Sequence, residues 1–410
     1  MSTKNQDLQP DTMSFLAHLR RLLPRLPHDY VRRRRAVRQL TNIVLIVVAS
    51  VATAYFITTP SGGRGFAPPK SALQSIPSSP SVPDSSAFSA AAPSSSAADA
   101  ADGYNLAPGP HAVSEASDLV LHDAKRNKDL HVRIFYPNDA GPYPVIVFSH
   151  GAGGSQDCCE ALTLHWATHG YVTIQPTHDD SAIQRRNSGE ENIRFPQAVR
   201  DGLKKPALWE SRPQDISFVI DSLPVLEHRV PGLVANMDKD RIGVGGHSMG
   251  SYTAEAIAGA IVDLPGHPGS NFADPRVKAV LCLSPQGPGQ FGLNDHSFDR
   301  LSLPYIGMTG SLDSLGPVAS PAWHKIPFER SLPSDKYHLY IEGANHGSFI
   351  TARTLSPTHA AQGEAILGYT NSASLAFWDA YLKNDARAKK YLQSDTLEKS
   401  SRGAAKLSRR

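Results

Sequence analysis

Residues 241–257 read RIGVGGHSMGSYTAEAI, and this stretch decides the fold class. The apolar run at its start predicts a buried strand, and the alanine-rich run at its end predicts a helix. Between the two lies GHSMG at 246–250, a G-x-S-x-G pattern. A nucleophilic serine on a sharp strand-to-helix turn needs glycines beside it, because larger side chains would clash there. The stretch therefore predicts that Ser248 is a nucleophile at the end of a central strand.

Short apolar runs alternate with helix-prone segments on both sides of this turn. Two strand-like runs at 117–123 and 130–137 come first and predict an antiparallel hairpin. Further strands are expected at 144–150, 171–176, 241–247, 276–284, 303–310 and 337–343, and helices at 161–170, 251–262 and 372–383. Apolar strands that alternate with helices predict an α/β fold with a mostly parallel central sheet covered on both faces.

Composition excludes several classes of protein. The 410 residues include 40% hydrophobic side chains, enough for a substantial core, so a wholly disordered chain is excluded. The net charge of +3 does not point to a nucleic-acid partner, and none is expected. Three cysteines are too few for a disulfide scaffold or a cysteine-based zinc module. The neighbours Cys158 and Cys159 could form a strained disulfide outside the cytoplasm, and no pairing is assigned.

One apolar run is long enough to cross a membrane. Leu40 to Thr59 gives about 20 residues, which matches a hydrocarbon core of about 30 Å. Nine basic and three acidic residues precede it, so the N-terminus is expected in the cytoplasm and the rest of the chain on the extracytoplasmic side. The alternative is a signal peptide cleaved after Ala54, which would release a secreted protein.

These features divide the chain into five expected parts. Residues 60–102 contain 12 Ser, 7 Pro and 10 Ala, which is typical of a flexible tether. The predicted parts are a basic cytoplasmic segment at 1–39, an anchor at 40–59, a linker at 60–109, a catalytic domain at 110–386 and a basic, frayed tail at 387–410.

A serine hydroxyl is a poor nucleophile, so a base must take its proton and an acid must orient that base. Six histidines follow Ser248 in the sequence. We predict His346 as the base, because it lies in the glycine-bounded loop GANHGSF directly after a predicted strand. We predict Asp313 as the acid, because it follows the strand at 303–310 and so lies at the carboxyl edge of the sheet. Asp295 and Asp299 are the rival acids, in a loop with no strand before it.

Acyl transfer also needs two N–H groups aimed at the developing oxyanion. The backbone N–H of Met249, directly after the nucleophile, is the first candidate. The second is expected in HGAGGS at 150–155, where a loop of small residues follows the first buried strand. We assign the N–H of Ala152, with Gly151 or Gly153 as alternatives that are also expected to line the substrate site. His178-Asp179-Asp180 could hold a metal, but a polar loop at the rim of the site is the preferred interpretation.

Together these residues resemble α/β-hydrolases. The similarity rests on HGAGGS, YVTIQPTHDDS, the W-x-x-R-x-x-D pattern at 209–215, DRIGVGGHSMGSYTA and GANHGSF, and it spans about residues 113–393. Within that superfamily the chain looks like dienelactone-hydrolase-like proteins and secreted platelet-activating-factor acetylhydrolases, and more distantly like polyester hydrolases and cutinases. The resemblance implies an α/β-hydrolase fold and a serine carboxylic-ester hydrolase without metal or cofactor. The chain departs from these families in two places. Position 248 is Ser, whereas dienelactone hydrolases have Cys. The acetylhydrolases take their catalytic acid from the end of the strand after the nucleophile helix, but no carboxylate follows the strand at 276–284 here.

The expected function is therefore hydrolysis of small-molecule esters through an acyl-enzyme. The polar segment between 177 and 215 is expected to form one wall of the pocket, with Trp209 as an apolar anchor. It lacks the apolar face of a lipase lid, so short acyl groups of about two to six carbons are expected. A polyester hydrolase or acyltransferase on the same residues is one alternative, and a tethered, inactive binding protein is another.

Overall fold

The computed structural model describes residues 104–316, 319–350 and 360–410. Every described residue belongs to one compact unit. The predicted basic segment, the anchor and all of the linker before residue 104 lie outside the described residues. Within the described part, no helix combines the length and the apolar character needed to span a bilayer.

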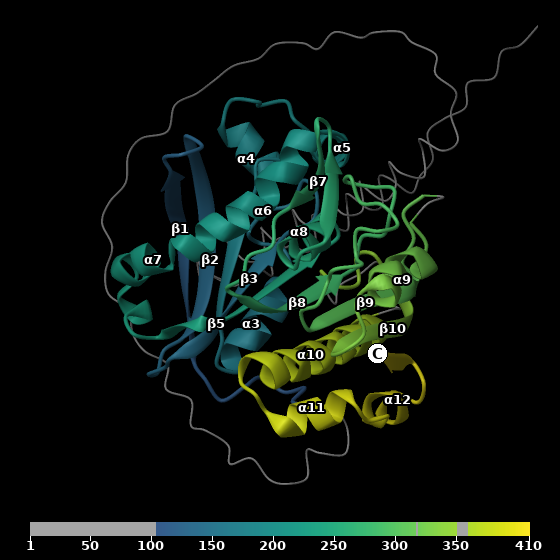
Figure 1. Ribbon diagram of the computed structural model, residues 1–410. Coiled ribbons are helices and arrows are strands. Elements are labelled where there is room, and N and C mark those ends of the chain that lie inside the picture. The colour runs from purple at the N-terminus through teal and green to yellow at the C-terminus, as the bar shows by residue number, and fades with distance from the viewer. Residues whose placement is uncertain (1–103, 317–318, 351–359) are drawn as a thin grey trace, which may run out of the picture. The chain divides into compact units, whose positions relative to one another are not determined.

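A nine-stranded sheet forms the centre of the fold (Figure 1). Its spatial order is β1-β2-β4-β3-β5-β8-β9-β10-β11, and the five contacts from β4 to β10 are parallel. The strands are β1 Val113–Asp123, β2 Lys128–Pro137, β3 Tyr143–Ser149, β4 Val172–Thr177, β5 Met237–His247, β8 Val277–Leu283, β9 Tyr305–Leu312, β10 Lys336–Asn345 and β11 Ala405–Arg409. β1 and β2 pair in antiparallel register, which confirms the predicted hairpin.

Helices cover both faces of the sheet, so two separate cores form. One core packs α3, α10, α11 and α12 against the sheet, and the other packs α6, α7, α8 and α9. The helices are α3 Glu160–Thr168, α4 Ala182–Asn187, α5 Phe195–Lys204, α6 Pro206–Asp221, α7 Leu223–Arg229, α8 Met249–Ile257, α9 Pro321–Arg330, α10 Ala360–Leu382, α11 Ala386–Leu392 and α12 Thr396–Ser400. This is the predicted α/β fold with a mostly parallel sheet and helices on both sides.

The sequence of the central strands explains why they lie in the middle. β3 reads YPVIVFS and is buried from its second residue onward, which is typical of a strand covered on both faces. Gly243 in β5 leaves room for a large helix side chain, because a Cβ there would lie 2.6 Å from the Trp378 ring of α10. Close contact between α10 and β5 therefore depends on a glycine in a central strand.

The predicted frayed tail at 387–410 is wrong. The segment forms α11, α12 and β11, and β11 pairs in antiparallel register with β10 from Tyr337 opposite Arg409 to Ile341 opposite Ala405. Its polar composition is typical of an edge strand, where charged side chains face solvent and Ala405 alone is buried. Composition alone therefore cannot distinguish this strand from a tail.

Three other boundaries differ from the predictions. The folded part begins before residue 110, since the Tyr104 hydroxyl donates to Asp379 at 2.9 Å. The helix expected to reach 262 ends at Ile257, because Gly259 adopts a φ of +100° and the chain turns into a hairpin. That hairpin, β6 Ile261–Leu264 with β7 His267–Asn271, was not predicted. The helix predicted at 372–383 is longer and includes residues from Ala360 onward.

Candidate active site

Ser248 lies on the turn between β5 and α8 with φ 57° and ψ −119°. This is a strained conformation for a residue with a side chain, and it is typical of functional turns. A Cβ on Gly246 would overlap the carbonyl oxygen of Gly250, and a Cβ on Gly250 would overlap that of Ser149. Both glycines are therefore required by the close packing of the turn. The Ser248 N–H donates to the Leu283 carbonyl at 2.9 Å, which fixes the turn to the neighbouring strand.

The structure brings two of the predicted residues into direct contact. His346 follows β10, Asp313 follows β9, and the His346 Nδ1 lies 3.0 Å from the Asp313 Oδ1. Asp313 is fully buried, and the hydroxyls of Ser284 and Thr309 donate to its Oδ2 at 2.7 and 2.9 Å. Because the two hydroxyls bind Oδ2, the Oδ1 of Asp313 can accept a hydrogen bond from the His346 imidazole.

The electrostatics suit a base oriented by an ionised acid. Burial alone would raise the pKa of Asp313, but the hydrogen bond from His346 and the hydroxyl of Ser284 hold it below its usual range. Burial lowers the pKa of His346, and the contact with Asp313 opposes that effect only in part. At neutral pH the imidazole is therefore neutral and the carboxylate charged, which is the pair of states that proton abstraction needs.

His247 connects the nucleophile turn to the loop of the base. Its Nε2 donates to the His346 carbonyl at 2.9 Å, and the two imidazole centroids lie 4.7 Å apart. Because His247 immediately precedes Ser248, this bond places the backbone of His346 beside the nucleophile turn. The rival acids lie elsewhere: Asp299 pairs with His296 and Asp295 with Arg330, all on the surface.

Sequence reasoning missed a second histidine beside Asp313. His324 of α9 is fully buried, its Nε2 lies 3.4 Å from the Asp313 Oδ1, and its Nδ1 donates to the Pro285 carbonyl at 2.6 Å. Ligand-type atoms of Asp313, His324 and His346 lie within 4.8 Å of one another, close enough to hold a metal ion. A metal there would take the His346 Nδ1 away from its hydrogen bond with Asp313, so the hydrogen-bonded arrangement fits these residues better.

Within the described residues, both predicted oxyanion N–H groups are free to donate to a ligand. Among the hydrogen bonds of residues 104–316, 319–350 and 360–410, none uses the N–H of Ala152 or that of Met249. A Cβ on Gly151 would lie 3.5 Å from the Ser248 Cβ, so the loop runs directly beside the nucleophile. A Cβ on Gly202 of α5 would lie 3.3 Å from both the Ala152 Cβ and the Met249 Sδ, so the two candidate donor residues flank one point of that helix.

Trp209 contacts the helix beside Ala152 and Met249, but in the described part of the chain it forms no hydrogen bond with either of these two residues. Its indole Nε1 donates to the Gly202 carbonyl at 2.9 Å, which ties α6 to α5. Its ring packs edge-on against Phe291 with a centroid distance of 5.8 Å. Part of the segment from 182 to 215, at Gly202, therefore lies beside Ala152, and its role as a wall of the pocket stays a prediction.

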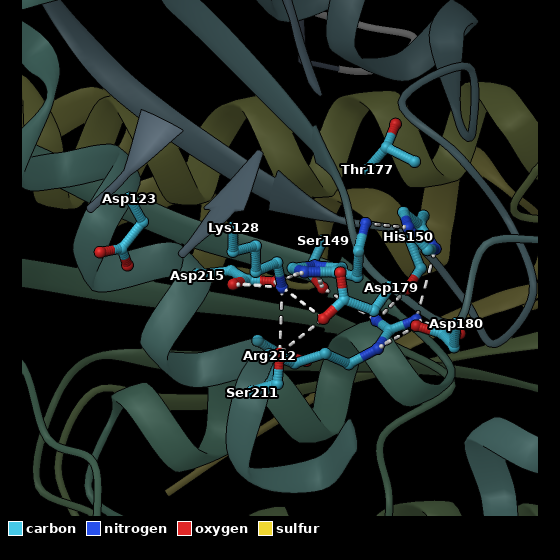
Figure 2. Close-up of polar contacts among 12 residues, drawn as sticks. Asp123, Lys128, Ser149, His150, Thr177, Asp179, Asp180, Ser211, Arg212 and Asp215 are labelled. Carbon is cyan, nitrogen blue, oxygen red and sulfur yellow. Dashed lines mark hydrogen bonds and ion pairs between the residues drawn. The ribbon is translucent and has the colours of Figure 1, made fainter. Parts of the chain in front are cut away.

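The polar motif His178-Asp179-Asp180 is more buried than a rim loop. His178 and Asp180 are fully buried, and only Asp179 reaches solvent, with 44% of its side chain exposed. Asp180 forms an ion pair with Arg212 at 2.8 Å (Figure 2). The His178 Nδ1 donates to Asp215 at 2.8 Å. These partners use the atoms that a metal would need.

The three cysteines are free thiols. Cys158 and Cys159 lie with their Sγ atoms 3.2 Å apart. The hydrogen bond from Cys159 and the neighbouring His247 lower the pKa of the Cys158 thiol, while burial raises that of Cys159. Cys282 is buried in β8, and burial raises its pKa, in agreement with a small apolar side chain in a strand.

The fold and the strand–turn–helix geometry around Ser248 have the features expected of an α/β-hydrolase, the class that the sequence resembles. Residues 109–265 match the family model described as Chlorophyllase, an α/β-hydrolase-type family of serine esterases. The matched range includes Ala152, Ser248 and Met249 and ends before Asp313 and His346. A search of curated proteins found no match. The comparisons thus support a serine ester hydrolase of the α/β-hydrolase type, and they do not single out the acetylhydrolase-like or dienelactone-hydrolase-like groups.

Proposed function

We propose that this protein is a serine carboxylic-ester hydrolase that acts through an acyl-enzyme on short-chain esters. The single observation that carries the proposal is the buried Asp313 bonded to His346 at 3.0 Å, with the backbone of His346 held beside the strained turn of Ser248. A protein that only binds a ligand needs no such ordered set of nucleophile, base and acid.

The mechanism follows from the roles of these groups. The Ser248 Oγ attacks the ester carbonyl carbon while His346 takes the hydroxyl proton. The N–H groups of Met249 and Ala152 bind the resulting oxyanion, and His346 then gives its proton to the leaving alcohol. Water attacks the acyl-enzyme in the second half of the reaction, with His346 again as base. Throughout, Asp313 holds the imidazole in the correct tautomer and stabilises its charged form.

The proposed substrates have acyl groups of about two to six carbons. Support comes from α4 and α5, the first elements of the wall, whose residues 182–204 include few buried apolar side chains. Each additional buried methylene is worth about 0.8 kcal/mol where a pocket can hold it. We therefore expect kcat/KM to rise with chain length and then to fall sharply once the pocket is full.

The name of the matched family adds chlorophyll as an ester to assay alongside synthetic substrates. The experiment is a p-nitrophenyl ester series from acetate to palmitate, with chlorophyll and a polyester film as separate substrates. A maximum between two and six carbons supports the short-chain proposal. A maximum at twelve carbons or more, or activation at an emulsion interface, contradicts it, and preference for the film favours the polyester hydrolase.

The proposed location is the extracytoplasmic side of a membrane, with the chain held by residues 40–59. Support comes from the sequence alone, namely the 20-residue apolar run after a basic segment. Cleavage after Ala54 and secretion is the alternative.

A further inference from the structure

The loop that carries Ala152 is held by a buried polar network that the sequence did not predict (Figure 2). We infer that Arg212, with Asp180 as its counter-ion, positions the Ala152 N–H for the oxyanion. This inference rests on the proposed function, because it assigns a role in the same reaction. Arg212 contacts no reacting atom in the proposed mechanism, so it is a positioning residue.

Arg212 binds the carbonyl groups on the N-terminal side of Ala152. The guanidinium is buried, with 1% of the residue exposed, and it reaches the loop from α6. Its Nη1 donates to the His150 carbonyl at 2.6 Å, and its Nη2 donates to the Gly151 carbonyl at 3.3 Å. Asp180 accepts from the other side of the guanidinium, with bonds of 3.0 Å from Nε and 2.8 Å from Nη2.

The direction of the Ala152 N–H follows from these bonds. In a trans peptide the C=O of one residue and the N–H of the next point in opposite directions. The Gly151 carbonyl accepts from Arg212, from the Gly154 N–H at 3.1 Å and from the His150 Nδ1 at 2.6 Å. Three donors on one side hold this peptide, so the Ala152 N–H points away from them.

The same ion pair also holds the peptide after Ala152. The Gly153 N–H donates to the Asp180 Oδ2 at 2.7 Å, and the Gly153 carbonyl accepts from the Ala182 N–H at 3.1 Å. Gly153 has a φ of +71°, which a residue with a side chain rarely adopts. Asp180 and Arg212 therefore fix the backbone on both sides of the candidate donor.

The protonation of His150 agrees with this arrangement. Its Nε2 accepts from the His178 N–H at 3.0 Å, so the ring proton lies on Nδ1, where it bonds the Gly151 carbonyl. Burial and the charge of Arg212 lower the pKa of His150 to about 4, so the ring is neutral at pH 7. The 3.3 Å contact between the Arg212 Nη2 and this Nδ1 joins two donors and does not count as a hydrogen bond.

An arginine suits this position better than a lysine. The planar guanidinium donates to two carbonyl oxygens and to both oxygens of a carboxylate, whereas an ammonium offers one compact donor group. The Arg212 Nη1 also donates to the Ser149 hydroxyl at 3.2 Å, and that hydroxyl donates to the His178 Nε2 at 2.9 Å. His178 in turn donates to Asp215, which Lys128 also reaches at 2.8 Å. The network thus connects the ends of β3 and β4 with α6.

The test compares Arg212→Lys with Arg133→Lys in the full-length protein. Arg133 is a matched control, because it is 3% exposed and its ion pairs are with Glu115, Asp157 and Glu160, none of which belongs to the loop at 150–155. Removing one oxyanion donor costs about 10²–10³ in kcat. We expect Arg212→Lys to lower kcat by about 10²-fold with KM changed less than about threefold, and Arg133→Lys to leave kcat per active site unchanged.

A trifluoromethyl ketone distinguishes positioning from mere stabilisation. It forms a tetrahedral adduct whose oxyanion uses the same N–H groups, so its Ki should rise by about the same 10²-fold in Arg212→Lys. This constant does not depend on the fraction of folded protein. An unchanged Ki and an unchanged kcat per titrated active site would overturn the inference.

Two controls complete the design. If Arg212→Lys does not fold, Asp180→Asn replaces it, because it keeps the shape of the side chain and removes the counter-charge. For Asp180→Asn we then expect the same rise in the Ki of the trifluoromethyl ketone and the same loss of kcat. If neither changes, the inference is overturned. If the unmodified protein hydrolyses no ester, or if Ser248→Ala keeps full activity, the proposed function itself fails, which is a separate outcome.

Discussion

The Nδ1 of His346 lies 3.0 Å from the Oδ1 of Asp313, although the two residues are 33 positions apart in the chain. The contact forms because β9 and β10 are parallel neighbours, so the loops after them leave the same edge of the sheet. Topology thus brings the base and the acid together.

Ser248→Ala and His346→Ala should each lower kcat by about 10⁴- to 10⁶-fold while the protein stays folded. Nucleophile and base act as a unit, so the double variant should lose little more than either single variant. Steady-state kinetics and circular dichroism on all three variants check this. If the free-energy losses of the two single variants added up in the double variant, the assignment of Ser248 and His346 as nucleophile and base would be contradicted.

Asp313→Asn should lower kcat by about 10⁴-fold, because an amide at this position favours the wrong tautomer of the imidazole. Asp299→Asn is the matched control, since Asp299 pairs with His296 on the surface and should have little effect. The comparison is kcat for both variants against the unmodified protein. A larger loss for Asp299→Asn would mean that the acid has been misplaced.

The pH dependence of kcat/KM should report His346. The imidazole must be neutral to accept a proton, so activity falls as pH drops through its pKa. Burial lowers that pKa, so the acid limb should have its midpoint below the ordinary histidine value of about 6.5. Asp313 stays ionised over this range, because its pKa is held below its usual value. A pH–rate profile from pH 4 to 9 measures the midpoint, and a value above 6.5 would be inconsistent with the described environment.

Full-length protein should fractionate with membranes and require detergent for release. A chain beginning near Asp102 should be soluble and have the same kcat, because the tether carries no candidate catalytic residue. Fractionation and N-terminal sequencing provide the measurement. A mature N-terminus at Tyr55 would show cleavage after Ala54 in place of an anchor.

Local patterns were sufficient to predict much of the fold and the positions of Asp313 and His346 directly after two strands of the sheet. The strand–turn–helix around Ser248 is encoded by adjacent glycines and apolar runs. The loop of His346 could be chosen because it follows a strand, and the structure places its side chain against Asp313. These inferences need only local sequence and the rule that parallel strands end at one edge.

What could not be predicted depends on contacts between distant segments. Arg212 belongs to the W-x-x-R-x-x-D pattern, but only the folded chain brings its guanidinium to the carbonyls of His150 and Gly151. His324 approaches Asp313 from α9, and no local pattern marks it. β11 was missed because an edge strand needs few apolar residues, and its pairing with β10 is visible only in three dimensions.

The central claim is that Ser248 is an activated nucleophile, and covalent labelling tests it most directly. Full-length protein is treated with a fluorophosphonate, digested and mapped by mass spectrometry, with Ser248→Ala and His346→Ala alongside. The account predicts one label per chain on Ser248, no label in Ser248→Ala and strongly slowed labelling in His346→Ala, because the base must remove the hydroxyl proton. A folded, unmodified protein that takes no label, or a label on another residue that persists in Ser248→Ala, would contradict the account.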